Sequence, residues 1–186
     1  MQRRRPWRVA GLLVPAALAF SAAGCCGRPP ASIVEVNLAL SRAKEACAAV
    51  YAPRELATVE GRVEEMNRLA DTRRCRKARS AAGPIRPDVL ALSSLVESRK
   101  DLAWRDAERA LSEAEASMAR ATDASLGRPG PSGLDAAGRS IALARRMSED
   151  PCAYLRAAAL AREAAAAADR AREAAPAGGA EEGPRR

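Results

Sequence analysis

Apolar residues recur at alternating spacings of three and four along most of this chain, and no other feature constrains its fold as strongly. The first seam of this kind consists of Ile33, Val36, Leu40, Ala43, Cys47 and Val50. The second consists of Leu56, Val59, Val63, Met66 and Ala70. Such spacings place side chains on one face of an α-helix. Each helix must then bury its apolar face against another helix.

The residue types agree with this pattern. Aromatic residues make up 3% of the chain and histidine is absent. Few stretches alternate β-branched or aromatic residues with polar ones, as strands do, whereas alanine favours helices. We therefore expect an all-α protein of antiparallel helical hairpins or a bundle with one long helix. Without histidine the chain lacks the usual general base and zinc ligand, so we expect no enzyme, metal or cofactor.

Breaks in the pattern divide the chain into helices. Pro53 suits the first turn of a second helix, and the short link before it predicts that the first two helices are antiparallel neighbours. Gly83, Pro84 and Pro87 predict an interruption of a third helix that begins near Thr72. A new helix is expected just after the second of these prolines.

The longest helical pattern covers residues 89–121. Its apolar seam shifts phase at residues 98–101, where we expect the helix to bend or to change its packing partner. Trp104 lies on the shifted seam, so its side chain is expected in the core. The alternative role for an aromatic residue here is an interface anchor.

Turn residues mark the other helix ends. The sequence GRPGPSG at residues 127–133 predicts a loop. Ser32 and Glu35 have the spacing of a capping box at the start of the first helix. The pair Asp150–Pro151 predicts the start of the last helix, with aspartate as cap and proline in the first turn.

The chain also contains a weak internal repeat. An offset of 77 positions aligns residues 61–82 with residues 138–159 and places Cys75 on Cys152. The helix breaks coincide as well. A repeat of this length predicts a duplicated three-helix unit, while coincidence in an alanine- and arginine-rich chain is the alternative.

The N-terminal segment has the layout of a secretory signal. Four arginines within residues 3–8 precede an apolar run over residues 9–23, which Pro15 interrupts. A helix that crosses a membrane needs about 20 apolar residues, so the alternative, an uncleaved membrane helix, is less well supported. Removal of these arginines would halve the net charge of +8, and binding to nucleic acid is not expected.

The end of this segment, Ala22-Ala23-Gly24-Cys25, resembles the bacterial lipobox. The resemblance implies that the Cys25 thiol receives a diacylglyceryl group and that a signal peptidase cuts before it. Cys26 is the alternative acceptor. Because Cys26 and not aspartate follows Cys25, the resemblance implies the periplasmic face of the outer membrane, rather than the inner membrane.

These features suggest five regions. We expect a cleaved signal peptide, a lipidated tether, a first helical unit with the long helix, a second helical unit and a disordered tail. Their bounds are residues 1–24, 25–31, 32–126, 132–175 and 177–186.

The body of the chain also resembles a family. The sequence YAPRELA at residues 51–57, followed by a helix and a basic, alanine-rich helix, resembles uncharacterised helical-hairpin lipoproteins of Gram-negative bacteria. Their hairpins look distantly like tetratricopeptide hairpins. The resemblance implies an envelope location and no known chemistry.

The densest run of charge is the strongest candidate for a binding site. It consists of Arg73, Arg74, Arg76, Lys77 and Arg79. Such a cluster suits lipid phosphates, lipopolysaccharide or an acidic partner, while an exposed, solvated helix face is the alternative.

Together these features favour a non-catalytic, lipid-anchored protein that scaffolds or binds envelope components. Its expected partners are the membrane, through the N-terminal lipid, and an envelope protein or the cell wall. The alternatives are a self-associating coiled coil, hence a homo-oligomer, and a carboxylate-based cell-wall hydrolase.

Four cysteines besides Cys25 allow three complete disulfide connectivities. If the two repeated units pack about a local two-fold axis, the equivalent residues Cys75 and Cys152 can meet. We therefore favour a Cys75–Cys152 disulfide, with Cys47 as a small buried apolar residue. The alternative is that all three are unpaired.

Overall fold

The computed structural model describes residues 30–125 and 133–174, which form helices and no strand. The expectation of an all-α fold is therefore confirmed for these residues. The helices are α1 (Ala31–Glu45), α2 (Ala48–Tyr51), α3 (Pro53–Asp71), α4 (Cys75–Ala124), α5 (Gly133–Met147) and α6 (Tyr154–Ala174). The signal segment, Cys25 and the expected tail lie outside the described residues.

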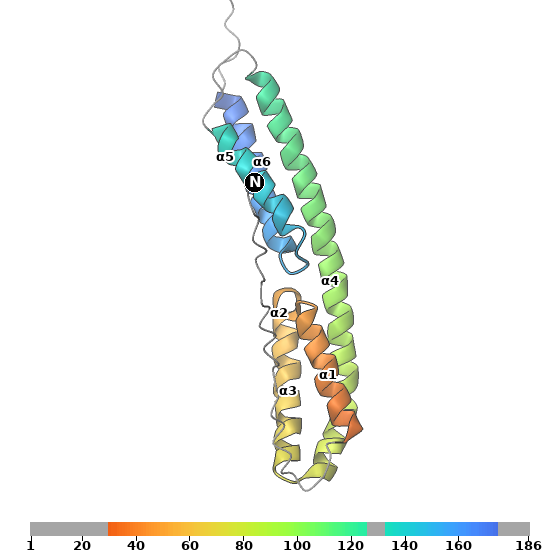
Figure 1. Cartoon of the computed structure of the whole chain (residues 1–186). Coiled ribbons are helices and arrows are strands. Elements are labelled where there is room, and N and C mark those ends of the chain that lie inside the picture. The colour runs from red at the N-terminus through yellow and green to blue at the C-terminus, as the bar shows by residue number, and fades with distance from the viewer. Residues whose placement is uncertain (1–29, 126–132, 175–186) are drawn as a thin grey trace, which may run out of the picture.

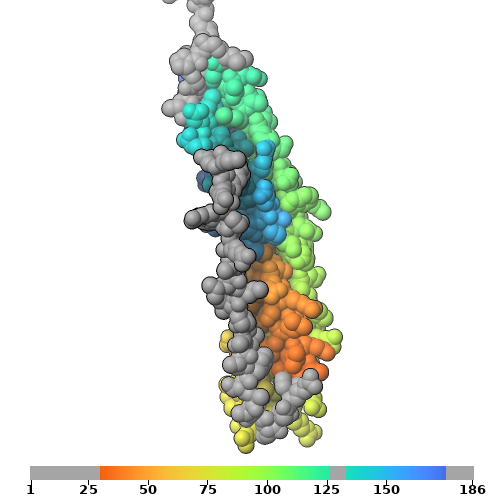
Figure 2. Space-filling model, in the orientation of Figure 1, coloured from red at the N-terminus to blue at the C-terminus, as the bar shows by residue number. Residues whose placement is uncertain are grey.

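Two three-helix bundles lie end to end along α4 (Figure 1). The proximal bundle consists of α1, α3 and the N-terminal half of α4, with the four-residue α2 in the link between α1 and α3. The distal bundle consists of the C-terminal half of α4 with α5 and α6. In each bundle the middle helix in the chain, α3 or α5, runs antiparallel to the other two. At 1.5 Å per residue the 50 residues of α4 extend for about 75 Å, so the molecule is a rod (Figure 2).

The two bundles have cores of different composition. Branched and large side chains fill the proximal core, including Ile33, Val36, Leu56, Val63, Met66 and Val89. The distal core consists largely of alanine, including Ala107, Ala114, Ala157, Ala161 and Ala168. Small side chains let helix backbones approach closely, so α4 and α6 can pack over their whole shared length without large residues.

The boundary between the cores falls inside α4. Ala103 belongs to the proximal core and Ala107 to the distal core. The phase shift expected at residues 98–101 thus lies next to the point where α4 exchanges α1 and α3 for α5 and α6. The core therefore does not divide at the loop after residue 126, where the expected regions were separated.

The prolines do not interrupt α4, contrary to the sequence-based expectation. Pro84 and Pro87 both lie inside this helix. Buried Ala82, Ile85 and Val89 keep the seam continuous past both prolines. Burial of this seam against α1 and α3 offsets the backbone hydrogen bonds that the prolines cannot donate.

Trp104 does not enter the core, and this expectation was also wrong. Its side chain is 47% exposed, whereas the neighbouring Ala103 and Ala107 are buried. A helix turns by about 100° per residue, so a seam centred one position earlier leaves the tryptophan at the surface.

The expected helix starts are confirmed in part. Pro53 lies in the first turn of α3. Glu35 forms no capping box, because α1 begins at Ala31 without a side-chain cap, and the Glu35 carboxylate instead pairs with Arg86 of α4 at 3.4 Å. Asp150 accepts a hydrogen bond from the Cys152 backbone N–H at 2.9 Å, but α6 begins only at Tyr154.

The 77-residue offset superimposes one helix–turn–helix on another. Residues 61–82 run from α3 into α4, and residues 138–159 run from α5 into α6. In both bundles these are the second and third helices along the chain. No helix of the described residues is long and apolar enough to cross a membrane.

Candidate functional site

The five basic residues singled out in the sequence lie together at one end of the rod, and we call this cluster the basic end. It comprises Arg73, Arg74, Arg76, Lys77 and Arg79, all of them exposed. Arg73 and Arg74 form the turn between α3 and α4, and the others lie in the first turns of α4. A single tight turn therefore gathers all five charges.

The turn closes through backbone hydrogen bonds. The Arg74 N–H donates to the Leu69 carbonyl at 2.9 Å and the Arg73 N–H donates to the Ala70 carbonyl at 3.1 Å. This pattern ends many helices and requires a left-handed residue, here Arg73 with φ of 63°. Glycine is the usual residue at such a position, so the arginine is held there at a conformational cost.

The basic end has no close ion-pair partner in the rest of the described protein. None of its five side chains forms an ion pair with a described residue. The nearby Glu65 is engaged by Arg68 at 2.7 Å. The hydrogen bond from Arg68 holds the Glu65 pKa below its usual value, and Arg74 contributes to the same shift. The helix dipole adds positive potential at the N-terminus of α4, and no acidic residue in its first turn offsets it.

The first helix begins at this same end of the rod. Asn37 of α1 and Asn67 of α3 exchange side-chain hydrogen bonds at 3.1 Å. The Glu35–Arg86 pair joins α1 to α4. These contacts place Ala31, and therefore the attachment of the N-terminal segment, close to the turn between α3 and α4 (Figure 1).

The opposite end of the rod has no such excess of charge. Its described residues, in the ranges 119–125, 133–139 and 168–174, contain four arginines and four acidic residues. The basic residues are Arg120, Arg139, Arg170 and Arg172, and the acidic ones are Asp123, Asp135, Asp169 and Glu173. The rod is thus electrostatically asymmetric along its axis.

The structure assigns the disulfide differently from the sequence analysis. Cys47 bonds to Cys152, with Cα atoms 5.4 Å apart, so the expected Cys75–Cys152 disulfide is wrong. Cys75 is itself disulfide-bonded. The bundles are related by a shift along α4 and not by a two-fold axis. Cys75 therefore lies roughly 35 Å along the rod from the level of Cys152, as judged from the rise of α4.

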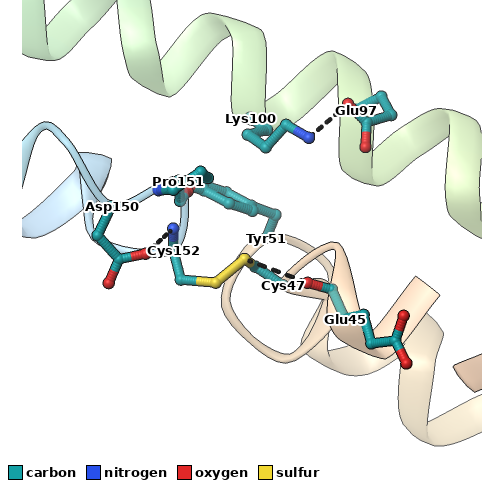
Figure 3. Close-up of a disulfide and its surroundings, with 8 residues drawn as sticks. All are labelled: Glu45, Cys47, Tyr51, Glu97, Lys100, Asp150, Pro151 and Cys152. Atoms are coloured by element: carbon teal, nitrogen blue, oxygen red, sulfur yellow. Dashed lines mark hydrogen bonds and ion pairs between the residues drawn. A yellow bond between two sulfur atoms is a disulfide. The ribbon is translucent and has the colours of Figure 1, made fainter. Parts of the chain in front are cut away.

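The disulfide joins the two helical turns that meet at mid-length (Figure 3). Cys47 lies between α1 and α2, directly before α2, with φ of 73°, and Cys152 lies in the turn between α5 and α6. Beside it the Tyr51 hydroxyl donates to the Pro151 carbonyl at 2.5 Å. Burial is the main cause that raises the pKa of the Tyr51 phenol. The disulfide and this hydrogen bond together fasten the two bundles to each other at the junction, and we call these two contacts the clamp.

Arg99 completes the junction from the side of α4. Its guanidinium donates to the Tyr51 carbonyl at 2.8 Å and to the Glu55 carboxylate at 2.8 Å. The hydrogen bond from Arg99 lowers the Glu55 pKa. Sequence reasoning missed this cluster. One signal pointed to it, since Cys47 and Cys152 each adjoin a proline-containing helix break.

The junction also carries a shallow, open hollow. It is lined by Tyr51, Arg99, Leu102, Ala103, Asp106 and Leu155. Leu102 and Leu155 are largely exposed. Within the described ranges, no three histidine, cysteine or acidic residues are grouped as metal ligands would be.

Comparison with protein-family models, curated proteins and solved structures finds no match for this chain. The role of the basic end and of the clamp must therefore be inferred from their own geometry and charge.

Proposed function

We propose that this protein is a lipid-anchored, non-catalytic rod of the bacterial envelope, which scaffolds or binds other envelope components. In this proposal Cys25 carries the lipid and the rod projects from the periplasmic face of the outer membrane. The lipobox-like sequence before Cys25 is the reason for the anchor. Two acyl chains on one cysteine suffice for stable membrane attachment, since a second chain makes anchoring durable.

The observation that carries the proposal is the position of α1. The helix begins at one end of the rod, six residues after Cys25. Six residues span at most about 20 Å, whereas α4 alone is about 75 Å long. A lipid on Cys25 would thus hold one end of the rod near the bilayer and leave the other end free to reach a partner.

The disulfide between the bundles supports an exported protein. Cys47 and Cys152 are 105 positions apart in the chain and bond across the junction. Structural disulfides form and persist in the periplasm and other oxidising compartments, and are rare in the cytosol. A bond that fastens one bundle to the next also suits a protein whose task is to hold a fixed length.

Self-association is a second candidate, which exposed apolar residues favour. Trp104 is 47% exposed, and Val34 and Leu38, one helical turn apart on α1, are 47% and 50% exposed. Such residues on a rod could pair with a second copy. Sedimentation of the chain from residue 25 tests this candidate, because self-association predicts a dimer or a larger oligomer.

Lipid attachment is tested in bacteria fed a labelled fatty acid. We expect the protein to incorporate the label and to fractionate with the outer membrane. Cys25→Ser should abolish the labelling and leave an uncut precursor, whereas Cys26→Ser, the matched control, should still be labelled and processed. Labelling and processing of the Cys25→Ser protein would disprove the anchor and with it the proposed function.

A further inference from the structure

We propose that the basic end is a second membrane contact, which binds the anionic phospholipid headgroups of the bilayer that holds the tether. The inference rests on the proposed function for the position of the lipid, and it adds the orientation of the rod. None of the five exposed side chains forms an ion pair with an acidic residue of the described protein. The guanidinium group of arginine matches the geometry of phosphate and can bind it through two parallel hydrogen bonds.

The position of the cluster identifies this partner. The basic end lies where α1 begins, so a tether of six residues keeps it within about 20 Å of the lipid on Cys25. Anionic headgroups attract basic residues that come within about a Debye length of the surface, close to 8 Å at physiological salt. The opposite end has balanced charge and lies outside this range when the rod stands on its basic end.

The conformation of the turn also favours a surface contact. The exposed α3–α4 link, residues 72–74, contains two arginines, and Arg73 is held in the left-handed region. Both arginines follow the last residue of α3 and precede the first residue of α4. Arg76, Lys77 and Arg79 follow in the first turns of α4, distributed around that helix, so all five exposed charges lie at the same end of the rod.

The test measures binding of the chain from residue 25 with Cys25→Ser, which has no lipid. We expect it to sediment with vesicles of phosphatidylglycerol and phosphatidylcholine, but not with vesicles of phosphatidylcholine alone. Raising the salt toward 1 M shortens the Debye length to about 3 Å and should release it. Binding to both kinds of vesicle, or to neither, would overturn the proposal.

The variant that removes the site is Arg73→Gly, Arg74→Ser, Arg76→Ser and Lys77→Ser. Glycine is chosen at position 73 because it suits the left-handed conformation. We expect affinity for anionic vesicles to fall at least tenfold, since each basic residue near the surface contributes about fivefold. The matched control removes the same charge elsewhere, with serine at Arg139, Arg156, Arg170 and Arg172, all exposed. Equal losses in both variants would overturn the proposal, and circular dichroism checks that both remain helical.

Trp104 reports the orientation, because it is the only tryptophan after residue 25. It lies 29 residues beyond Cys75 in α4, about 43 Å along the rod. If the rod stands on its basic end, brominated lipids should not quench Trp104 fluorescence. Strong quenching would mean that the rod lies flat, and would overturn the proposal.

A contact with lipid headgroups is distinguished from a contact with the cell wall by a second binding partner. Binding to purified cell-wall sacculi in place of vesicles would assign the basic end to an acidic polymer and overturn the inference.

The proposal of a lipid anchor and the proposal for the basic end can also be disproved separately. If Cys25 is lipidated but the lipid-free protein ignores anionic vesicles, only this inference fails. If the lipid-free protein binds anionic vesicles but Cys25 carries no lipid, the proposed function is disproved, whereas the basic end is still a surface that binds anionic lipid.

Discussion

At the scale of single residues, Tyr51 shows how one side chain can hold two bundles together. It ends α2, is 4% exposed, and donates from its hydroxyl to the Pro151 carbonyl of the opposite bundle. Its own carbonyl accepts from Arg99 of α4. One residue therefore connects all three parts of the junction, which explains a buried phenol in a chain with few aromatic residues.

The Tyr51 hydrogen bond should make stability fall at alkaline pH. Burial raises the folded-state pKa of this phenol above its ordinary value of 10.0. Its contribution is then complete below about pH 10 and is lost as the pH rises through the folded-state pKa. Tyr51→Phe should lower the free energy of unfolding at neutral pH by about 1 kcal/mol.

The check is urea unfolding of both proteins across this pH range. The difference in the free energy of unfolding between wild type and Tyr51→Phe should shrink above pH 10, because the wild type loses the contribution of the Tyr51 hydroxyl, which the variant lacks at every pH. A constant difference would show that the phenol does not ionise with a raised pKa in the folded protein.

At the scale of helices, α4 decides the architecture. It is the third helix of the proximal bundle and the first of the distal bundle, and it passes through two prolines without ending. Prolines inside a helix cost about 3 kcal/mol each in isolated helices. The helix continues because its buried seam, Ala82 to Val89, has packing partners on α1 and α3 across the same turns.

Replacing Pro84 by alanine should therefore stabilise the protein. Pro84 is exposed, so alanine loses little packing and restores an N–H that can donate to the Ser80 carbonyl. We expect the free energy of unfolding to rise by about 1–2 kcal/mol, part of the gain being offset because alanine frees the unfolded chain.

The matched control is Pro53→Ala. Pro53 lies in the first turn of α3, where no helix hydrogen bond is lost, so this change should be neutral or slightly destabilising. Denaturant unfolding measures both variants. A loss of stability in Pro84→Ala would contradict a continuous α4 at this point.

At the scale of the whole molecule, the rod depends on the bond between its two bundles. Cys47 and Cys152 bring together turns that are 105 positions apart. In the chain-entropy account, a loop of this length closed by a disulfide stabilises by about 4–5 kcal/mol. The double variant Cys47→Ala, Cys152→Ala should lose up to this amount.

Unfolding of the double variant should also become less cooperative. Without the bond, the bundles remain coupled through α4 and the Tyr51 contact, so thermal unfolding should broaden or separate into two steps. Peptide mapping of the non-reduced wild type should recover residues 47 and 152 in one linked pair. Recovery of Cys152 linked to another cysteine would refute this arrangement.

The sequence alone determined the features that depend on neighbouring residues. The spacing of apolar residues predicted helices, Pro53 predicted the start of α3, and the phase shift at residues 98–101 predicted where α4 changes partners. It also identified the basic cluster. Each of these follows from interactions within a few turns of one helix, where the spacing of side chains is set by the backbone itself.

Only the tertiary structure decided how distant parts meet. The choice of Cys47 over Cys75 as partner of Cys152 depends on whether the bundles stack or face each other, and no local spacing encodes this. Likewise, α4 passes Pro84 because α1 and α3 bury the same turns, and Trp104 is exposed because Ala103, one residue earlier, occupies the buried position. The tertiary structure also decided that the basic cluster lies at the same end of the rod as the start of α1, because α1 packs parallel to α4.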